Sequence, residues 1–173
     1  MIEYRVLKKE GFTEKVGELV SMLDHARAVT LEEVEALSQE ELDYLPDDRS
    51  NSIGALLLHI AAIEYVHQVI SFENRDLTEE EFGEWGPALE LGDRARKTVR
   101  NQPISYYVNA LAKVRERTYA LLKEKHDEWL YEENKWPNDV AYNNYYLWFH
   151  VLEDEISHRG QMRIIKRNIR SFH

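Results

Sequence analysis

The sequence predicts an all-α protein, a four-helix bundle that forms a single domain over residues 1–173. Only four prolines and seven glycines interrupt the chain, which favours long helices over many short strands. Apolar residues recur at helical spacing through four separate stretches. A hydrophobic fraction of 43% and a length of 173 residues are enough to bury the core of one globular domain.

The first two long helices are expected in the N-terminal half. Ser38 and Glu41 have the spacing of a capping box on a single turn between them. Asn51 or Ser52 caps the second helix, which is predicted to run to about Glu73. The first helix is predicted from a stripe at helical spacing: Phe12, Val16, Leu19, Leu23, Ala26, Thr30, Val34 and Leu37.

Residues 75–102 are the least regular part of the sequence. Thr78 and Glu81 can open a short helix there, and Phe82 and Trp85 either cover a pocket or fasten the segment to the core. A connection of this length is either functional or a crossover at one end of the bundle. Four residues are expected to prevent a long helix: Gly83, Gly86, Pro87 and Gly92.

The third long helix is predicted to begin near Pro103 and to fade near residues 129–131. The segment ENKWPND, residues 133–139, is expected to be a linker into the fourth helix, over residues 142–166. The third helix has a buried face at helical spacing: Ile104, Tyr107, Leu111, Val114, Thr118, Leu121 and Leu122.

The fourth helix carries a polar pair in the middle of an apolar face. Asp154 and His158 are one turn apart, so their Cβ atoms lie roughly 6 Å from each other. Burying such a pair without partners is costly, which makes it informative. At about 100° per residue one face holds six residues: Leu147, Val151, Asp154, His158, Gln161 and Ile165.

The second helix repeats this pattern with His59 at the centre of its inward face. If the two faces meet, His59, Asp154 and His158 converge and predict a divalent-metal site for Zn, Ni, Mn or Fe. Three protein ligands with open positions are typical of a reactive site. The alternative is a satisfied core histidine beside an ordinary Asp–His ion pair. The inward face is Ser52, Ala55, Leu56, His59, Ile63, Val66 and Ile70.

Other polar residues near this site are predicted to play lesser roles. His150 and His67 each lie eight residues, about 12 Å, from a proposed ligand on the same helix, too far to share its ion. His150 can instead pair with Asp154. Glu155 points away from the ligand face and is a poor general base, whereas Gln161 can orient a ligand. No residue is assigned a catalytic role.

A second apolar face on the fourth helix predicts a homodimer. Tyr145, Phe149, Leu152 and Ile156 lie about opposite the proposed ligands, and Trp148 joins this interface or packs at its edge. A helix that is apolar on both sides needs a partner surface in a small bundle. We therefore expect a two-fold dimer through this helix.

Composition limits the classes of function. The net charge of −10 argues against binding to nucleic acid, whose phosphates would be repelled. The absence of cysteine removes thiolate nucleophiles and cysteine-held metal centres. With no signal-peptide pattern and no segment expected to reach the length of a membrane span, we predict a cytoplasmic protein without membrane contacts.

Two segments carry a resemblance to a known family. The run HVLEDEISHRGQ, with the tetrad HRGQ at residues 158–161, and the run SIGALLLHIAAIE resemble the DinB/YfiT-like family of metal-dependent proteins. The resemblance implies an up-down-down-up four-helix bundle that is commonly dimeric. It also implies a metal held by one histidine of the second helix and two of the fourth. His59 and His158 match this pattern, whereas Asp154 replaces a histidine.

The resemblance implies two kinds of activity on a small-molecule substrate. Relatives include thiol-cofactor S-transferases, so we expect a metal-dependent thiol S-transferase or hydrolase. The carboxylate of Asp154 is a harder ligand than imidazole and shifts the metal preference, or marks a site that has lost its metal. The alternative is a non-catalytic dimeric bundle, a binding or stress-response module with a vestigial metal site. A two-histidine-one-carboxylate iron oxygenase matches by ligand type only.

Overall fold

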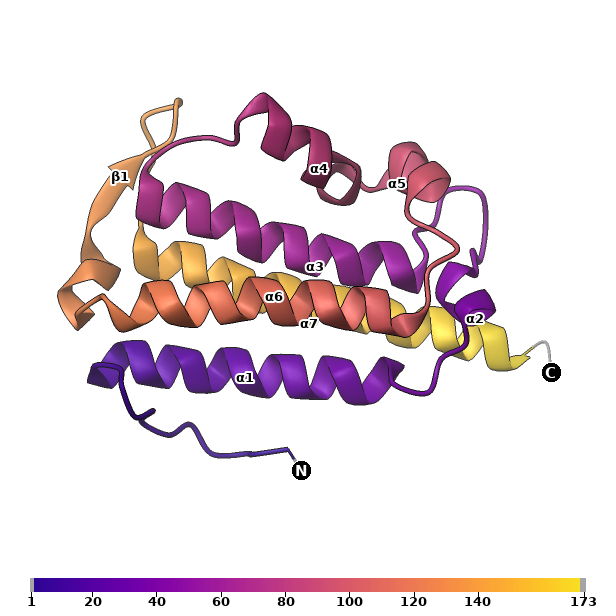
Figure 1. Cartoon of the computed structure of the whole chain (residues 1–173), viewed down its shortest axis with the longest axis horizontal. Helices are drawn as coiled ribbons and strands as arrows, with labels where there is room; N and C mark the ends of the chain where they lie inside the picture. The colour runs from indigo at the N-terminus through magenta and orange to yellow at the C-terminus, as the bar shows by residue number, and fades with distance from the viewer. Residues whose placement is uncertain (1, 172–173) are drawn as a thin grey trace.

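Four long helices form the body of the computed structural model, which describes residues 2–171. They are α1 (Glu14–Val34), α3 (Ile53–Gln68), α6 (Ile104–Lys123) and α7 (Asn144–Ser171). In Figure 1, α1 and α7 run in one direction and α3 and α6 in the other. The predicted four-helix bundle with up-down-down-up topology is confirmed.

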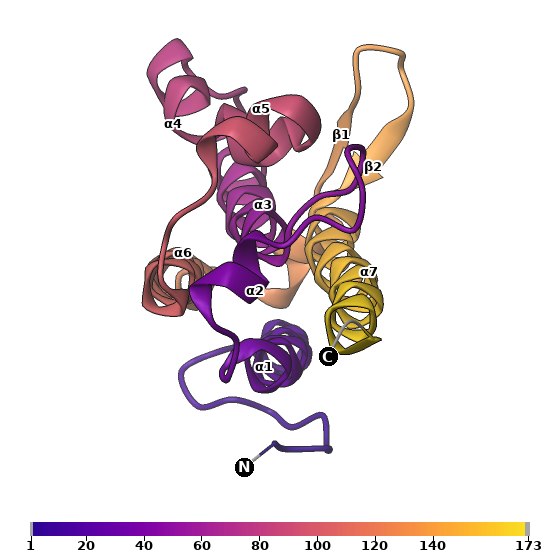
Figure 2. The same ribbon diagram turned by 90° about the vertical axis from the view of Figure 1, so that its right-hand side faces the viewer.

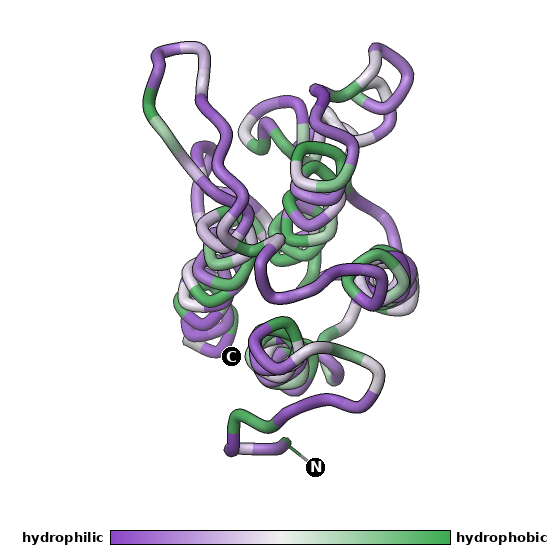
Figure 3. Tube along the Cα trace, turned by 90° about the vertical axis from the view of Figure 1, so that its left-hand side faces the viewer, coloured by the Kyte–Doolittle hydropathy of each residue, from purple (hydrophilic) through white to green (hydrophobic). Residues whose placement is uncertain are grey.

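The four long helices surround a common core. Helix α3 packs against both α6 and α7, and α1 packs mainly against α7. Figure 2, almost along the helix axes, shows α1 and α3 on opposite sides of the bundle, with α6 and α7 between them. Figure 3 shows that hydrophobic segments gather towards the middle of the bundle. This arrangement places the inward faces of α3 and α7 against each other.

Capping residues set the beginnings of several helices. Ser38 and Glu41 form the predicted capping box and open the short helix α2 (Gln39–Asp43). At the start of α3, the Ser52 hydroxyl accepts a hydrogen bond from the Ala55 N–H at 3.1 Å. Both signals could be recognised in the sequence because caps depend on residues three positions apart.

Beyond Gln68, α3 continues as one π-helical segment, η1 (Val69–Glu73). The combined helix Ile53–Glu73 is long and apolar enough to cross a membrane, so the expectation that no segment reaches that length is wrong. However, 72% of its apolar window is buried inside the protein. Such burial is typical of the core helix of a soluble protein.

The connection between α3 and α6 is more regular than predicted. It holds α4 (Glu79–Glu90), opened by the Thr78–Glu81 capping box, and α5 (Gly92–Thr98). Pro87 lies inside α4 without ending it. No long helix forms in this segment, as expected, because it divides at Leu91 into α4 with 12 residues and α5 with 7. In Figure 1 the two helices lie along the outer side of α3.

The expected linker before α7, residues 133–139, forms part of a β-hairpin, which the sequence did not indicate. After the 3₁₀ segment η2 (Asp127–Tyr131), strand β1 (Glu133–Lys135) pairs antiparallel with β2 (Ala141–Asn143). Trp136 stacks on Tyr142 with ring centroids 3.9 Å apart, which joins the two sides of the hairpin.

Trp148 belongs to the core, so its predicted place in or beside a dimer interface is wrong. Its side chain is fully buried, and its indole N–H donates to the Ser71 hydroxyl at 3.2 Å. The other residues of that apolar face are divided. Tyr145 and Leu152 pack partly against the core, whereas Phe149 and Ile156 remain 49% and 45% exposed.

Candidate metal centre

His59 of α3 and the Asp154–His158 pair of α7 converge, as the sequence predicts. One nitrogen or oxygen atom from each of the three side chains lies within 4.8 Å of the other two. Asp154 Oδ1 is 3.3 Å from His158 Nε2 and 3.7 Å from His59 Nε2. The two imidazole rings are nearly perpendicular, with centroids 4.6 Å apart. All three side chains are buried or half-buried.

These separations suit atoms that share one ion. An ordinary N–H···O hydrogen bond brings nitrogen and oxygen to about 2.9–3.0 Å, closer than either contact from Asp154. Two atoms each about 2.0–2.1 Å from a tetrahedrally coordinated ion lie roughly 3.3 Å apart. The observed distances of 3.3 and 3.7 Å are close to that value. The two separations from Asp154 therefore have the spacing that a shared divalent ion requires.

The backbone of α4 orients His59. The Nδ1 atom of His59 lies 2.8 Å from the carbonyl oxygen of Ala88. Since a carbonyl oxygen only accepts, Nδ1 carries the proton and donates this hydrogen bond. In the neutral form of this ring the lone pair is on Nε2, which is the atom that faces Asp154. A hydrogen bond of this kind fixes both the tautomer and the direction of a metal-binding imidazole.

The Ala88 carbonyl is available because it lies in the last turn of α4, where carbonyls have no donor within the helix. Leu91, with φ of +54°, ends α4. The Gly92 N–H, four residues after Ala88, donates instead to Asn51 Oδ1 at 2.9 Å. Sequence reasoning missed this contact because a backbone carbonyl leaves no signature in the side chains.

Aromatic and polar contacts fasten α4 to α3. The Trp85 indole stacks on the Tyr65 ring with centroids 5.1 Å apart. The Tyr65 hydroxyl donates to Glu81 Oε1 at 2.8 Å. Of the two predicted roles for Trp85, attachment to the core is the one observed. The connection between α3 and α6 thus contributes to the geometry of the site.

The local electrostatics favour a carboxylate that can bind a cation. Burial raises the pKa of Asp154, but the imidazoles of His158 and His59 outweigh burial and lower the pKa below its ordinary value. Asp154 is therefore ionised at neutral pH. Asp154 Oδ2 and His158 Nδ1 are buried and have no hydrogen-bond partner among residues 2–171. A buried anion with unsatisfied atoms beside it fits a bound divalent cation.

The remaining predicted residues lie outside this group. Gln161 is exposed, so its predicted role in orienting a ligand has no support from its position. His150 contacts Glu153 Oε1 at 2.9 Å, and this pairing replaces the expected pairing with Asp154. Glu155 points away from the site, as predicted, and is completely buried.

His67 stays neutral beside the site. Its Nδ1 atom is 2.7 Å from the Ile63 carbonyl, and its ring centroid is 5.3 Å from that of His150. Burial lowers the pKa of His67 to about 4. His67 therefore carries no charge at neutral pH, and it is not one of the three residues that converge.

Comparisons with known proteins agree with this architecture. The family model of mycothiol S-transferase matches residues 18–171. The crystal structure of a conserved protein from Enterococcus faecalis is similar with a TM-score of 0.68 and 19% sequence identity, over 88% of this chain and 95% of that chain. That likeness supports the fold alone. No curated protein matches the chain. Because the family model covers well over half of the sequence, the chain belongs to the mycothiol S-transferase family, a family of DinB/YfiT-like fold.

Proposed function

We propose that the protein is a metal-dependent thiol S-transferase. His59, Asp154 and His158 hold one divalent ion, drawn from Zn, Ni, Mn and Fe, and a low-molecular-weight thiol is transferred to a small electrophilic substrate. The observation that carries this proposal is the convergence of three ligand atoms within 4.8 Å in a chain of this family.

The chemistry assigns the thiol to a second substrate, because the chain contains no cysteine. A divalent cation held by His59, Asp154 and His158 would lower the pKa of a bound thiol and so supply a thiolate near neutral pH. The thiol loses its proton to solvent, its sulfur forms a bond to the electrophilic carbon, and the leaving group departs with the electrons of its former bond. Asp154 offsets the charge of the ion, while Ala88 keeps His59 correctly oriented.

A metal and activity assay on untagged protein tests this proposal. We expect about one divalent ion per chain and metal-dependent loss of free thiol in the presence of an electrophile, lost with a chelator and recovered on adding the metal. Metal-dependent turnover of an ester or amide without thiol would indicate a hydrolase instead. Metal-free protein whose thermal stability does not change on adding Zn, Ni, Mn or Fe would contradict the proposal and favour the non-catalytic bundle.

We also propose a homodimer through α7, on a surface that keeps Phe149 and Ile156 of the predicted face and extends to Ile164. Phe149 and Ile156, two turns apart, are 49% and 45% exposed, and Ile164, two turns further, is 52% exposed. An exposed apolar stripe along one helix is typical of a protein–protein interface. This stripe also suits the self-complementary contact of a two-fold dimer.

Charge introduced on this stripe is expected to separate the dimer. We predict that Phe149→Glu combined with Ile156→Glu gives a monomer at micromolar concentration, because the carboxylates would be desolvated in the interface. Sedimentation equilibrium measures the change. Tyr106→Glu, at a 44% exposed aromatic on α6, is the matched control and should leave the dimer intact. A monomeric wild-type protein, or a dimeric double variant, would contradict the proposal.

A further inference from the structure

Four buried charged residues, one from each long helix, meet in the middle of the bundle. Arg27 of α1, Glu64 of α3, Arg115 of α6 and Glu155 of α7 are 7%, 0%, 5% and 0% exposed. We call them the ionic layer. Two arginines and two glutamates balance in charge, as buried ions require. None of the four belongs to the candidate metal site.

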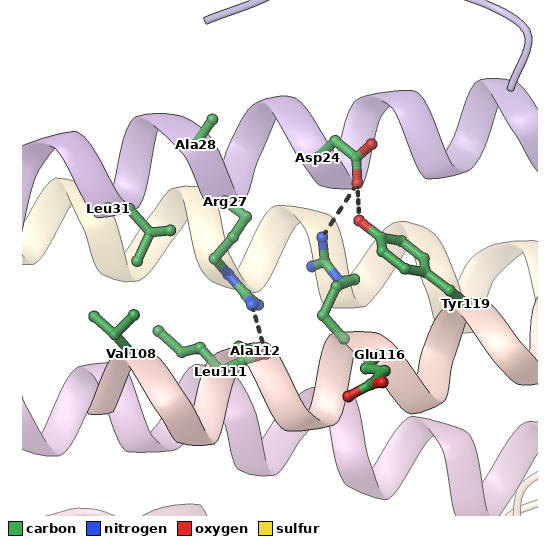
Figure 4. A pocket seen from close by; sticks show the side chains of 10 residues that line it. Asp24, Arg27, Ala28, Leu31, Val108, Leu111, Ala112, Glu116 and Tyr119 are labelled. Atoms are coloured by element: carbon green, nitrogen blue, oxygen red, sulfur yellow. Dashed lines mark hydrogen bonds and ion pairs between the residues drawn. The ribbon is translucent and has the colours of Figure 1, made fainter. Parts of the chain in front are cut away.

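Arg27 contacts all three of the other long helices. It makes a two-point contact with Glu155, Nε to Oε1 at 3.0 Å and Nη2 to Oε2 at 3.2 Å. Its Nη2 atom also donates to Glu64 Oε2 at 2.9 Å. Its Nη1 atom donates to the Leu111 carbonyl of α6 at 3.0 Å (Figure 4). One guanidinium of α1 thus joins α3, α6 and α7.

Arg115 closes the layer from α6. Its Nε and Nη2 atoms donate to the two oxygens of Glu64 at 2.7 and 3.1 Å. Its Nη2 atom lies 3.8 Å from Glu155 Oε2. The Thr118 hydroxyl donates to Glu64 Oε1 at 2.6 Å. Forked contacts of this type fix direction as well as distance.

The layer divides the hydrophobic core. One cluster includes Leu56 and Ile165, and the other includes Leu23 and Trp148. Along α1, α6 and α7, the charged residue lies between the buried positions that belong to one cluster and those that belong to the other. Apolar burial is not directional, so the two clusters restrict the rotation of a helix about its axis only to the width of its apolar face. The directional contacts at the centre narrow that rotation further.

A cavity makes this constraint important for α1. About 480 Å³ of space lies between α1 and α6, lined on its two sides by residues such as Ala28 and Val108 (Figure 4). Direct packing between the two helices is interrupted there. The bond from Arg27 to the Leu111 carbonyl crosses between them beside this cavity.

The rotation of α3 and α7 decides whether the candidate ligands meet. Glu155 directly follows Asp154, so the two side chains diverge by about 100° around α7. Glu64 lies five residues after His59, which separates them by about 140° around α3. When both glutamates are held inside the ionic layer, His59 and Asp154 must face each other on the side of α4.

We infer that the ionic layer positions the metal ligands by fixing the rotation of α3 and α7. Arg27 and Glu155 are positioning residues in this account. The inference rests on the proposed function where metal binding is the readout. For the metal-free protein, the inference also states that the ionic layer maintains the His59–Ala88 hydrogen bond, because this bond forms only at one rotation of α3 about its axis.

A charge-balanced double variant tests the inference without leaving an unpaired buried ion. Arg27→Met with Glu155→Met keeps Arg115 and Glu64 paired, and such replacements are often tolerated for stability. We expect a folded protein with a cooperative thermal transition and a metal affinity lowered at least about tenfold, as for other residues that orient ligands. The absorption bands of the Co²⁺ form should also change, because they report ligand geometry.

Glu33→Gln is the matched control, because Glu33 of α1 pairs with Arg163 and Lys166 of α7 at a more exposed site. It should leave both metal affinity and the Co²⁺ spectrum unchanged. A double variant with wild-type affinity and spectrum overturns the inference and leaves the proposed function intact. If the double variant fails to fold, Arg27→Lys, which keeps the charge but not the forked contact, is measured in the same way with the same criteria.

A wild-type protein that binds no metal overturns the proposed function, and the inference is then decided on the metal-free protein. The Nδ1 proton of His59, protected by Ala88, should give a slowly exchanging NMR resonance in the wild type. Loss of this resonance in the double variant Arg27→Met with Glu155→Met supports the inference, and a retained resonance overturns the inference.

Discussion

Glu64→Gln is expected to lower the free energy of unfolding by about 3–5 kcal/mol, a large part of the stability of a single domain. Glu64 is completely buried and accepts hydrogen bonds from Arg27, Arg115 and Thr118. The amide removes one negative charge and leaves two buried guanidiniums with one carboxylate, Glu155. Chemical denaturation with urea measures the loss.

Glu73→Gln is the control for this prediction. Glu73 lies further along the same helical segment and pairs with Arg75 and Arg117, but its side chain is 35% exposed. Because exposed pairs contribute about 0–1 kcal/mol, this variant should stay close to the wild type. If Glu64→Gln and Glu73→Gln lower the free energy of unfolding equally, burial of the ionic layer does not determine how much the layer contributes to stability.

The pH dependence of stability gives an independent measure of the same contact. Burial raises the pKa of Glu64, but the charges of Arg115 and Arg27 outweigh burial and lower it from 4.5 to about 2. A lowered carboxyl pKa stabilises the fold above the unfolded-state value, and that stabilisation is lost as the pH falls from 4.5 to about 2. We expect Glu64 to account for about 3 kcal/mol of the loss over this interval. This part should be absent in Glu64→Gln.

The sequence was sufficient for features that depend on spacing along one helix. His59, Asp154 and His158 could be found because each interrupts an apolar stripe at a definite position. The Ser38–Glu41 and Thr78–Glu81 capping boxes could be found because their partners are three residues apart. In these cases the physical interaction is local, so the residue spacing in the sequence is enough to predict it.

Features that depend on contacts between distant segments could not be predicted in the same way. Arg27, Glu64 and Arg115 belong to residue types that are almost always exposed, and only the packed bundle shows that they pair in its centre. The hairpin strand Glu133–Lys135 has only exposed polar side chains, so it lacks the alternation that signals a strand. Its pairing depends on β2, not on its own sequence.

Helix α4 shows how a local rule can be overridden. Pro87 predicts a helix end because it removes one backbone donor. The helix nevertheless continues past Pro87 to Glu90. Trp85, one turn before the end of the helix, stacks on Tyr65 and holds α4 against α3. Tertiary packing therefore outweighs the cost of the proline. The result is a carbonyl, that of Ala88, at His59 Nδ1.

His59→Ala and His158→Ala are each expected to lower the affinity for a divalent ion by about 100-fold or more. Structural zinc sites with four protein ligands bind with roughly 10–16 kcal/mol, so one ligand corresponds to about 3 kcal/mol. At about 1.4 kcal/mol per factor of ten, this loss is on the order of 100-fold. Either variant also leaves Asp154 buried beside a single imidazole. Competition with a chromophoric chelator measures the affinity of each variant.

His150→Ala is the matched control, because His150 lies on the same helix as His158 but contacts Glu153 instead of Asp154. It should keep the affinity of the wild type, since a residue eight positions from His158 is about 12 Å away along the helix. If His150→Ala loses the metal as His158→Ala does, the ion is held further along α7 than the three convergent side chains allow. If neither His59→Ala nor His158→Ala loses it, the ion binds elsewhere, and the Asp154–His158 pair is an ion pair of the core.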